Sequence, residues 1–176
     1  MKRRIFALLA ALCLLASMND MAAPSVSLEG RQLWLAQSLP VTPWQVLRAK
    51  LEMQLLLTGV PVLFCALCMV IALPGSALEK ALLVIVTLLY TLLSALAALA
   101  LGLKMPNLTW TNEITPIKQG GAVMLALFSG FAYVALIVVG YLLLGSKIGL
   151  TAYLTAFAAL TLLLAALLVS ISMVVM

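Results

Sequence analysis

The sequence predicts an all-α polytopic membrane protein in which transmembrane helices form a bundle. Hydrophobic residues make up 66% of the 176 positions and charged residues only 9%, whereas a soluble domain is about 45–50% apolar and about 25% charged. Four uncharged runs, of 19 to 27 residues, are long enough to cross a hydrocarbon core of about 30 Å. The same composition excludes a water-soluble globule and an intrinsically disordered chain.

The four runs predict four full transmembrane helices, at residues 55–73, 81–103, 122–144 and 150–176. None of them has a charge near its centre, so each should insert into a bilayer. They are apolar on all sides, which favours helices over the alternating strands of a membrane barrel. Pro61, two residues after Gly59, predicts a kink in the first of them.

Residues 1–18 hold a shorter hydrophobic helix, with an apolar run only from residue 5 to residue 16. A short apolar run after Lys2, Arg3 and Arg4 is typical of a secretory signal. The alternative is the remnant of a spanning helix. The two interpretations place residues 17–53 on opposite sides of the membrane, so the distribution of basic residues helps to choose between them.

The basic residues between the apolar runs predict how the chain is oriented across the membrane. The polar segments 17–53 and 104–121 share one side and hold five of them, Arg31, Arg48, Lys50, Lys104 and Lys118. The segments on the opposite side hold two, Lys80 and Lys147. The positive-inside rule therefore places the first two segments in the cytoplasm. This favours the remnant of a span, although it leaves the basic N-terminal residues on the other face.

Residues 19–50 are predicted to form a cytoplasmic amphipathic elbow before the membrane domain at 51–176. Three leucines spaced i, i+7 and i+11 fall on one side of a helix, namely Leu28, Leu35 and Leu39. Pro40 ends this helix, and Thr42, Pro43 and Gln45 form a capping signal that starts the next one. The elbow either anchors the following span at the interface or docks a cytoplasmic partner.

Two further polar features allow two interpretations each. The loop at 104–121 is too long for a simple helical hairpin connection, and is either a solvated connector or a second contact surface. Thr87, Thr91 and Ser94 share one face of the second long run. Such hydroxyls either join helices inside a membrane or line a translocation pathway.

The sequence lacks the residues that several classes of function require. The four long runs carry no Asp, Glu, Lys or Arg at depth, which disfavours an ion-coupled carrier. The sequence has no GxxxxGK[ST] motif, no histidine and no catalytic triad, so we expect neither an enzyme, an ATPase site nor a metal site. Cys65 and Cys68 form a lone C-x-x-C, which we interpret as packing. The basic residues lie between apolar runs, so we expect no nucleic-acid partner.

Two spaced motifs resemble a family of bacterial ABC exporter membrane subunits. The first comprises Asn19-Asp20, residues 23–31, Leu33-Trp34 and residues 37–43, close to the pattern S-x-E-G-[KR]-x-x-W-x-x-[KQ]-S-L-P. The second comprises Lys104, Pro106, residues 110–113 and Lys118-Gln119, similar to a family loop that contains W-T-N-E. The resemblance covers these two stretches, and the apolar runs around them agree in placement.

The resemblance implies a permease of the type-2 ABC exporter group, in a bacterial cytoplasmic (inner) membrane. Such a subunit pairs with a separate ATPase subunit, which binds ATP-Mg, while the permease itself binds no cofactor. Carried over to this chain, the elbow that couples to the ATPase comprises Glu29, Gly30, Arg31, Trp34, Ser38, Leu39, Pro40 and Pro43. The second cytoplasmic loop comprises Pro106, Trp110, Asn112, Glu113, Lys118 and Gln119.

Members of that family are longer and have more spans than this chain, which resembles their C-terminal part. We therefore expect a missing N-terminal half or a second permease copy as a further partner, beside the ATPase and the lipid bilayer. Nothing in the spans specifies the transported substrate. The alternative function is a structural or scaffold membrane protein that transports nothing.

Overall fold

The protein is all-α, as predicted. The computed structural model describes residues 2–30, 38, 40–108, 110, 112, 114, 117 and 120–174, and within these no strand occurs. Five segments are long and apolar enough to cross a membrane, one more than the four full spans predicted from the sequence. These segments are Ile5–Leu28, Pro43–Ala72, Ala77–Lys104, Gly121–Leu143 and Leu150–Ser170.

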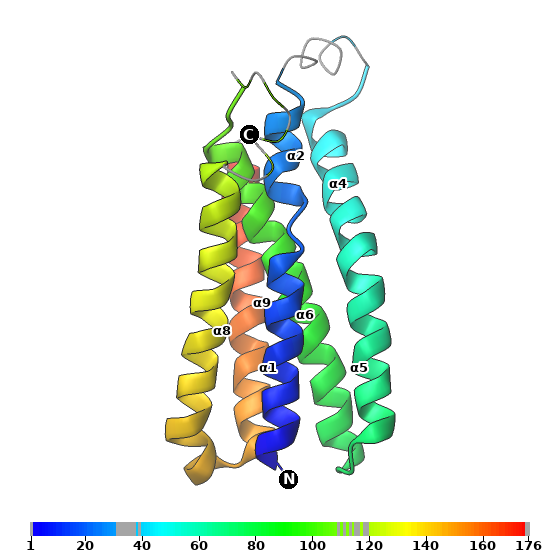
Figure 1. Ribbon diagram of the computed structural model, residues 1–176, viewed down its shortest axis with the longest axis vertical. Helices are drawn as coiled ribbons and strands as arrows, with labels where there is room; N and C mark the ends of the chain where they lie inside the picture. The colour runs from blue at the N-terminus through cyan, green and yellow to red at the C-terminus, as the bar shows by residue number, and fades with distance from the viewer. Residues whose placement is uncertain are drawn as a thin grey trace.

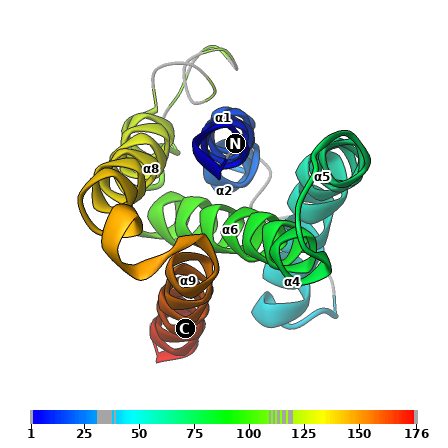
Figure 2. The ribbon, with the colours of Figure 1, turned by 90° about the horizontal axis from the view of Figure 1, so that it is seen from below.

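Helix α6 (Ala77–Lys104) forms the centre of the bundle. Figure 2 shows it surrounded by α1 (Lys2–Met18), α5 (Val60–Ala72), α8 (Gly121–Ile148) and α9 (Leu150–Val174). More than half of its apolar window is buried, the largest share of any of the five segments. Side chains from α1, α5, α6, α8 and α9 form the main core, for example Phe6, Val86, Tyr141 and Leu154.

The first membrane segment is built from two helices placed end to end, α1 and α2 (Ala22–Leu28). The chain breaks between them at residues 19–21, where polar Asn19 and Asp20 stand. Gln54 stabilises the break, because its Oε1 accepts hydrogen bonds from the backbone N–H groups of Met21 and Ala22 at 2.8 and 3.1 Å. The apolar segment therefore extends beyond residue 16 and reaches the length of a span, with α2 as part of it.

The second segment starts at α4 (Pro43–Gln54) and continues through η1 (Leu55–Gly59) into α5. The predicted capping signal is present, since Gln45 Oε1 accepts a hydrogen bond from the Thr42 backbone N–H at 2.9 Å and Pro43 is the first helical residue. The π-helical turn η1 lies just before Pro61, the residue at which the sequence predicts a kink. A proline has no N–H to donate along the helix, and a wider turn is one way to accommodate that loss.

Short turns join the remaining helices at one end of the bundle. Ser76 caps α6, since its hydroxyl accepts a hydrogen bond from the Glu79 N–H at 3.2 Å, and Glu79 Oε2 accepts one from the Ser76 N–H at 3.2 Å. Gly149, with φ at +91°, separates α8 from α9. This left-handed conformation favours glycine and allows the chain to reverse within one residue.

The two longer polar segments, 29–42 and 105–120, connect helices at the same end of the bundle (Figure 1), as the order of runs predicts. The N-terminus of α1 lies at the opposite end, with the α5–α6 turn. Lys2, Arg3 and Arg4 therefore join the side of Lys80 and Lys147. The distribution of five basic residues against two becomes five against five, so basic residues alone do not orient this bundle.

Candidate functional site

The end of the bundle that carries both motifs is built around α2. This helix lies directly on α6, because Gly102 leaves room for the backbone of Ala23. A Cβ at position 102 would stand 2.6 Å from the Ala23 carbonyl oxygen, closer than real contacts allow. Ala22, Ala23, Pro24 and Ser27 are all buried as a result. Small residues at such a crossing are the usual means of close helix approach in membranes.

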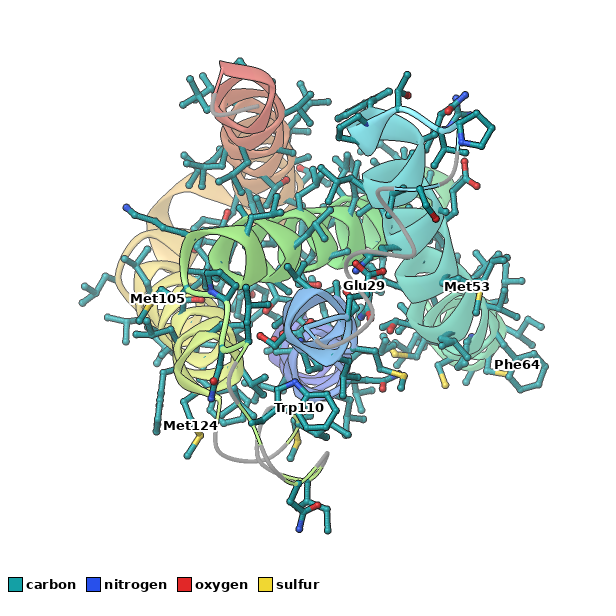
Figure 3. The ribbon with its side chains drawn as sticks, turned by 90° about the horizontal axis from the view of Figure 1, so that it is seen from above. Glu29, Met53, Phe64, Met105, Trp110 and Met124 are labelled. Atoms are coloured by element: carbon teal, nitrogen blue, oxygen red, sulfur yellow. The ribbon has the colours of Figure 1, made fainter. Side chains whose placement is uncertain are left out.

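Ser27 joins the two motifs. Its side-chain Oγ accepts a hydrogen bond from the backbone N–H of Asn107 at 3.1 Å, and its carbonyl oxygen accepts one from the Trp110 indole Nε1 at 2.7 Å. These residues are about 80 positions apart in the sequence. Figure 3 looks down on this end and shows Trp110 and Glu29 on different sides of α2. The first motif and the second loop thus form one surface.

Gly30 allows the same two segments to touch through their backbones. Its N–H donates to the Ser27 carbonyl oxygen at 3.2 Å, which closes the turn after α2. A Cβ at this position would stand 2.9 Å from the carbonyl oxygen of Leu108. Because that neighbour is backbone, any side chain here would push the second loop away from α2. The glycine of the Glu-Gly-Arg motif therefore has a steric explanation.

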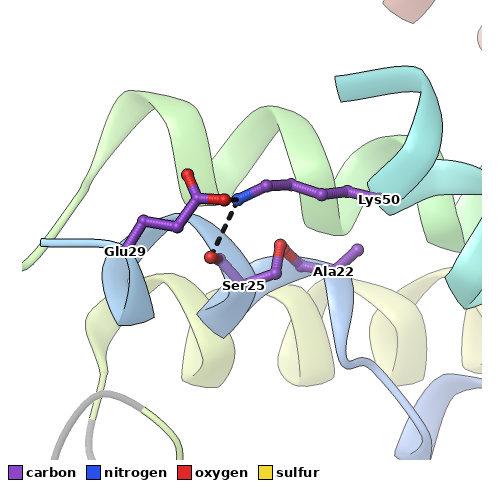
Figure 4. A network of polar contacts seen from close by, with 4 residues as sticks. All are labelled: Ala22, Ser25, Glu29 and Lys50. Atoms are coloured by element: carbon purple, nitrogen blue, oxygen red, sulfur yellow. Dashed lines mark hydrogen bonds and ion pairs between the residues drawn. The ribbon is translucent and has the colours of Figure 1, made fainter. Parts of the chain in front are cut away.

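An ion pair connects α2 to α4 (Figure 4). The Lys50 ammonium lies 2.9 Å from Glu29 Oε1 and also donates to the Ser25 carbonyl oxygen at 2.9 Å. The Lys50 side chain is only 12% exposed, whereas Glu29 is 37% exposed. A cation near the last carbonyl groups of a helix is favourable, so Lys50 both fixes the end of α2 and holds Glu29. Arg48 and Glu52 on α4 form a second pair that is largely exposed.

The other motif residues that the structure describes are mostly exposed. Ser38, Pro40, Pro106 and Asn112 are exposed, and the Asn112 Oδ1 accepts a hydrogen bond from the Ile114 N–H at 3.1 Å. Pro43 starts α4. Six predicted site residues lie outside the described residues, and they are Arg31, Trp34, Leu39, Glu113, Lys118 and Gln119.

The hydroxyl face of α6 lies inside the bundle. Thr87 and Thr91 are buried, and their hydroxyls donate to carbonyl oxygens one turn earlier in α6, at 2.7 and 2.8 Å. Ser94 donates to the Thr91 carbonyl oxygen at 3.0 Å and lines a cavity of about 340 Å³ between α6, α8 and α9. Tyr90, one turn from Ser94, is hydrogen-bonded to Ser17 of α1 and donates to the Gly130 carbonyl oxygen of α8 at 3.3 Å.

Sequence reasoning did not select three residues that the structure places at the centre of this surface, namely Ser27, Lys50 and Leu108. Ser27 stands inside the first motif, so its place there was the only available signal. Lys50 was counted only as a basic residue near the membrane surface. Leu108 contributes backbone atoms, which no side-chain pattern reveals.

Comparisons with protein-family models, with curated proteins and with solved structures return no match for this chain. Among the residues that the structure describes, no group of three or more His, Cys, Asp or Glu side chains could hold a metal ion. The fold and composition define a multi-pass α-helical membrane protein.

Proposed function

We propose that this chain is a membrane-spanning subunit, or part of one, of an ABC-type exporter in a bacterial cytoplasmic membrane. The surface formed by the first motif and the second loop faces the cytoplasm and contacts a separate ATPase subunit. That subunit binds ATP-Mg and supplies the free energy, while this chain is no enzyme and binds no cofactor of its own. A missing N-terminal half or a second permease copy completes the pathway.

One observation carries this proposal. The two stretches that resemble the exporter family meet in space, through Ser27, Asn107 and Trp110, although about 80 residues separate them. If the resemblance were accidental, we would not expect the two stretches to form hydrogen bonds with each other. A surface that transmits motion from an ATPase needs this kind of direct connection to the spans, here from Trp110 through α2 to α6.

The proposal also agrees with what the sequence lacks. The chain carries no phosphate-binding loop, so any uphill transport needs an external source of free energy. The four longest runs carry no charged residue at depth that would serve as an ion-coupling site. A partner that hydrolyses ATP would be such a source.

Co-expression with candidate ABC ATPase subunits from the same genome, followed by purification in mild detergent, tests the proposal. We expect the two proteins to elute together, and we expect a Glu29→Ala, Arg31→Ala double variant to retain at least ten-fold less ATPase. The matched control is Glu79→Gln, Lys80→Ala, which also removes one acid and one base but at the opposite end of the bundle.

The control should retain the ATPase at the level of the unchanged protein, and all variants should still insert into the membrane. Failure of the ATPase to elute with the unchanged chain would favour a scaffold protein without transport. Equal losses in both double variants would contradict the assignment of the contact surface.

A further inference from the structure

A groove of about 730 Å³ lies between α2 and α4. This volume falls in the range of small-molecule sites, about 300–1,000 Å³. Its walls are mainly apolar and include Met21, Ala49, Met53 and Leu57. Met53 and Leu57 are about half exposed, at 60% and 47%, so the groove is reached from the side of the bundle where lipid tails would lie.

The described lining of the groove contains one acidic side chain that has no basic partner. It contains three charged side chains, Asp20, Glu29 and Lys50. Lys50 pairs with Glu29, which leaves Asp20 as the acidic side chain without a basic partner in this lining. Asp20 Oδ1 is buried and forms no hydrogen bond within the described part of the chain.

The neighbours of Asp20 do not satisfy it because they bond to one another. The Asn19 side chain donates to the Thr58 hydroxyl at 3.2 Å, and Gln54 Nε2 donates to the Asn19 carbonyl oxygen at 2.6 Å. Asp20 also lies below the bundle end, separated from Glu29 by the length of α2, which is about 10 Å for its seven residues. An ionised carboxylate at such depth is costly unless a cation accompanies it.

We propose that this groove binds an amphiphilic monocation, whose ammonium group pairs with Asp20 and whose hydrocarbon tail lies along Met53 and Leu57. A single carboxylate attracts one positive charge. A bare metal ion would find no further acidic or histidine ligand in the described lining beyond Glu29, which Lys50 already occupies. Apolar walls that open sideways suit a tail that arrives from the membrane.

This binding site goes beyond the proposed function and does not depend on it. Binding is measured on the full chain alone, without an ATPase, so either proposal can fail while the other stands.

The test is equilibrium binding of dodecyltrimethylammonium to the purified full-length chain in dodecyl maltoside, followed by native mass spectrometry. The detergent carries the same tail without a charge and therefore serves as the uncharged competitor. We expect one saturable site in the unchanged protein and at least ten-fold weaker binding in Asp20→Asn. Asp20→Glu, which restores the charge, should recover most of the affinity.

Two further variants test separately whether binding depends on the position of the carboxylate and on the open volume of the groove. Glu52→Gln removes an exposed carboxylate on another face of α4, outside the groove lining, and should bind normally. Ala49→Phe keeps Asp20 but fills the groove, and should lose the site even if the Asp20 variants fold poorly. The proposal would be overturned if Asp20→Asn and Ala49→Phe both bound dodecyltrimethylammonium as tightly as the unchanged protein.

A zwitterionic lipid also carries an ammonium group, so phosphatidylethanolamine is added as a competitor. Retention of the probe against an excess of this lipid supports a site for a monocation. Displacement of the probe by the lipid would overturn that assignment and would indicate that the groove binds a membrane lipid.

Discussion

Replacement of Gly102 by alanine tests the contact that holds α2 in the bundle. The new Cβ would stand 2.6 Å from the Ala23 carbonyl oxygen, whereas ordinary contact begins at 3.4 Å. One of the two helices must therefore shift by about 0.8 Å, the difference between these distances, because the neighbouring atom is backbone and cannot rotate away. Overpacking of this kind costs about 1–3 kcal/mol.

A matched control isolates the clash from the effect of alanine on the helix itself. An added Cβ at Gly59 meets no atom within 4 Å, and glycine to alanine within a helix gains up to about 1 kcal/mol at either position. We expect Gly102→Ala to unfold at about 1–3 kcal/mol lower free energy than Gly59→Ala. Titration with sodium dodecyl sulfate in mixed micelles, followed by circular dichroism, measures both. Equal stabilities would refute the close approach of α2 and α6.

Three other substitutions test the polar contacts, each by the same unfolding titration. Gln54→Leu should cost about 2–3 kcal/mol, because the backbone N–H groups of Met21 and Ala22 lose their acceptor inside the bundle; a loss below 1 kcal/mol would show that water or another group replaces it. Tyr90→Phe should cost about 0.6–1.7 kcal/mol, the range for hydrogen bonds between membrane helices, and an unchanged stability would remove the hydroxyl from the contact. Lys50→Met should cost about 1 kcal/mol through loss of its partly exposed ion pair with Glu29, and a stability gain would contradict a stabilising role.

The long helices were predictable because their signal is local. A charge-free apolar run specifies a membrane helix without reference to any other part of the chain. The helices also extend beyond the runs where capping residues lie outside them. Ser76 and Glu79 start α6 four residues before the predicted residue 81, and Pro43 starts α4 well before residue 55.

The length of the first segment was not predictable from its own residues. Asn19 and Asp20 interrupt the apolar run, and by local rules such residues end a membrane helix. The structure continues into α2 because Gln54 and Thr58, which are more than 30 positions away, accept and donate hydrogen bonds at the break. A tertiary partner of this kind leaves no periodic pattern in the sequence.

The candidate surface was predictable only in part. The resemblance selected Glu29, Gly30 and Trp110 by their place in two motifs, without indicating that the motifs touch. The contact depends on backbone atoms of Ser27 and Leu108, which a sequence pattern does not report. Pairing of Lys50 with Glu29 also depends on the angle between α2 and α4, which is set by packing.

The side of the membrane that this surface faces is the central claim, and cysteine labelling tests it directly. Pro40→Cys and Gly75→Cys place one exposed thiol at each end of the bundle. The native Cys13, Cys65 and Cys68 lie within the spans, so the unchanged protein measures the background labelling. The account predicts that a membrane-impermeant maleimide labels Gly75→Cys in intact bacterial cells and reaches Pro40→Cys only after the cytoplasmic membrane is permeabilised. Labelling of Pro40→Cys in intact cells would contradict it.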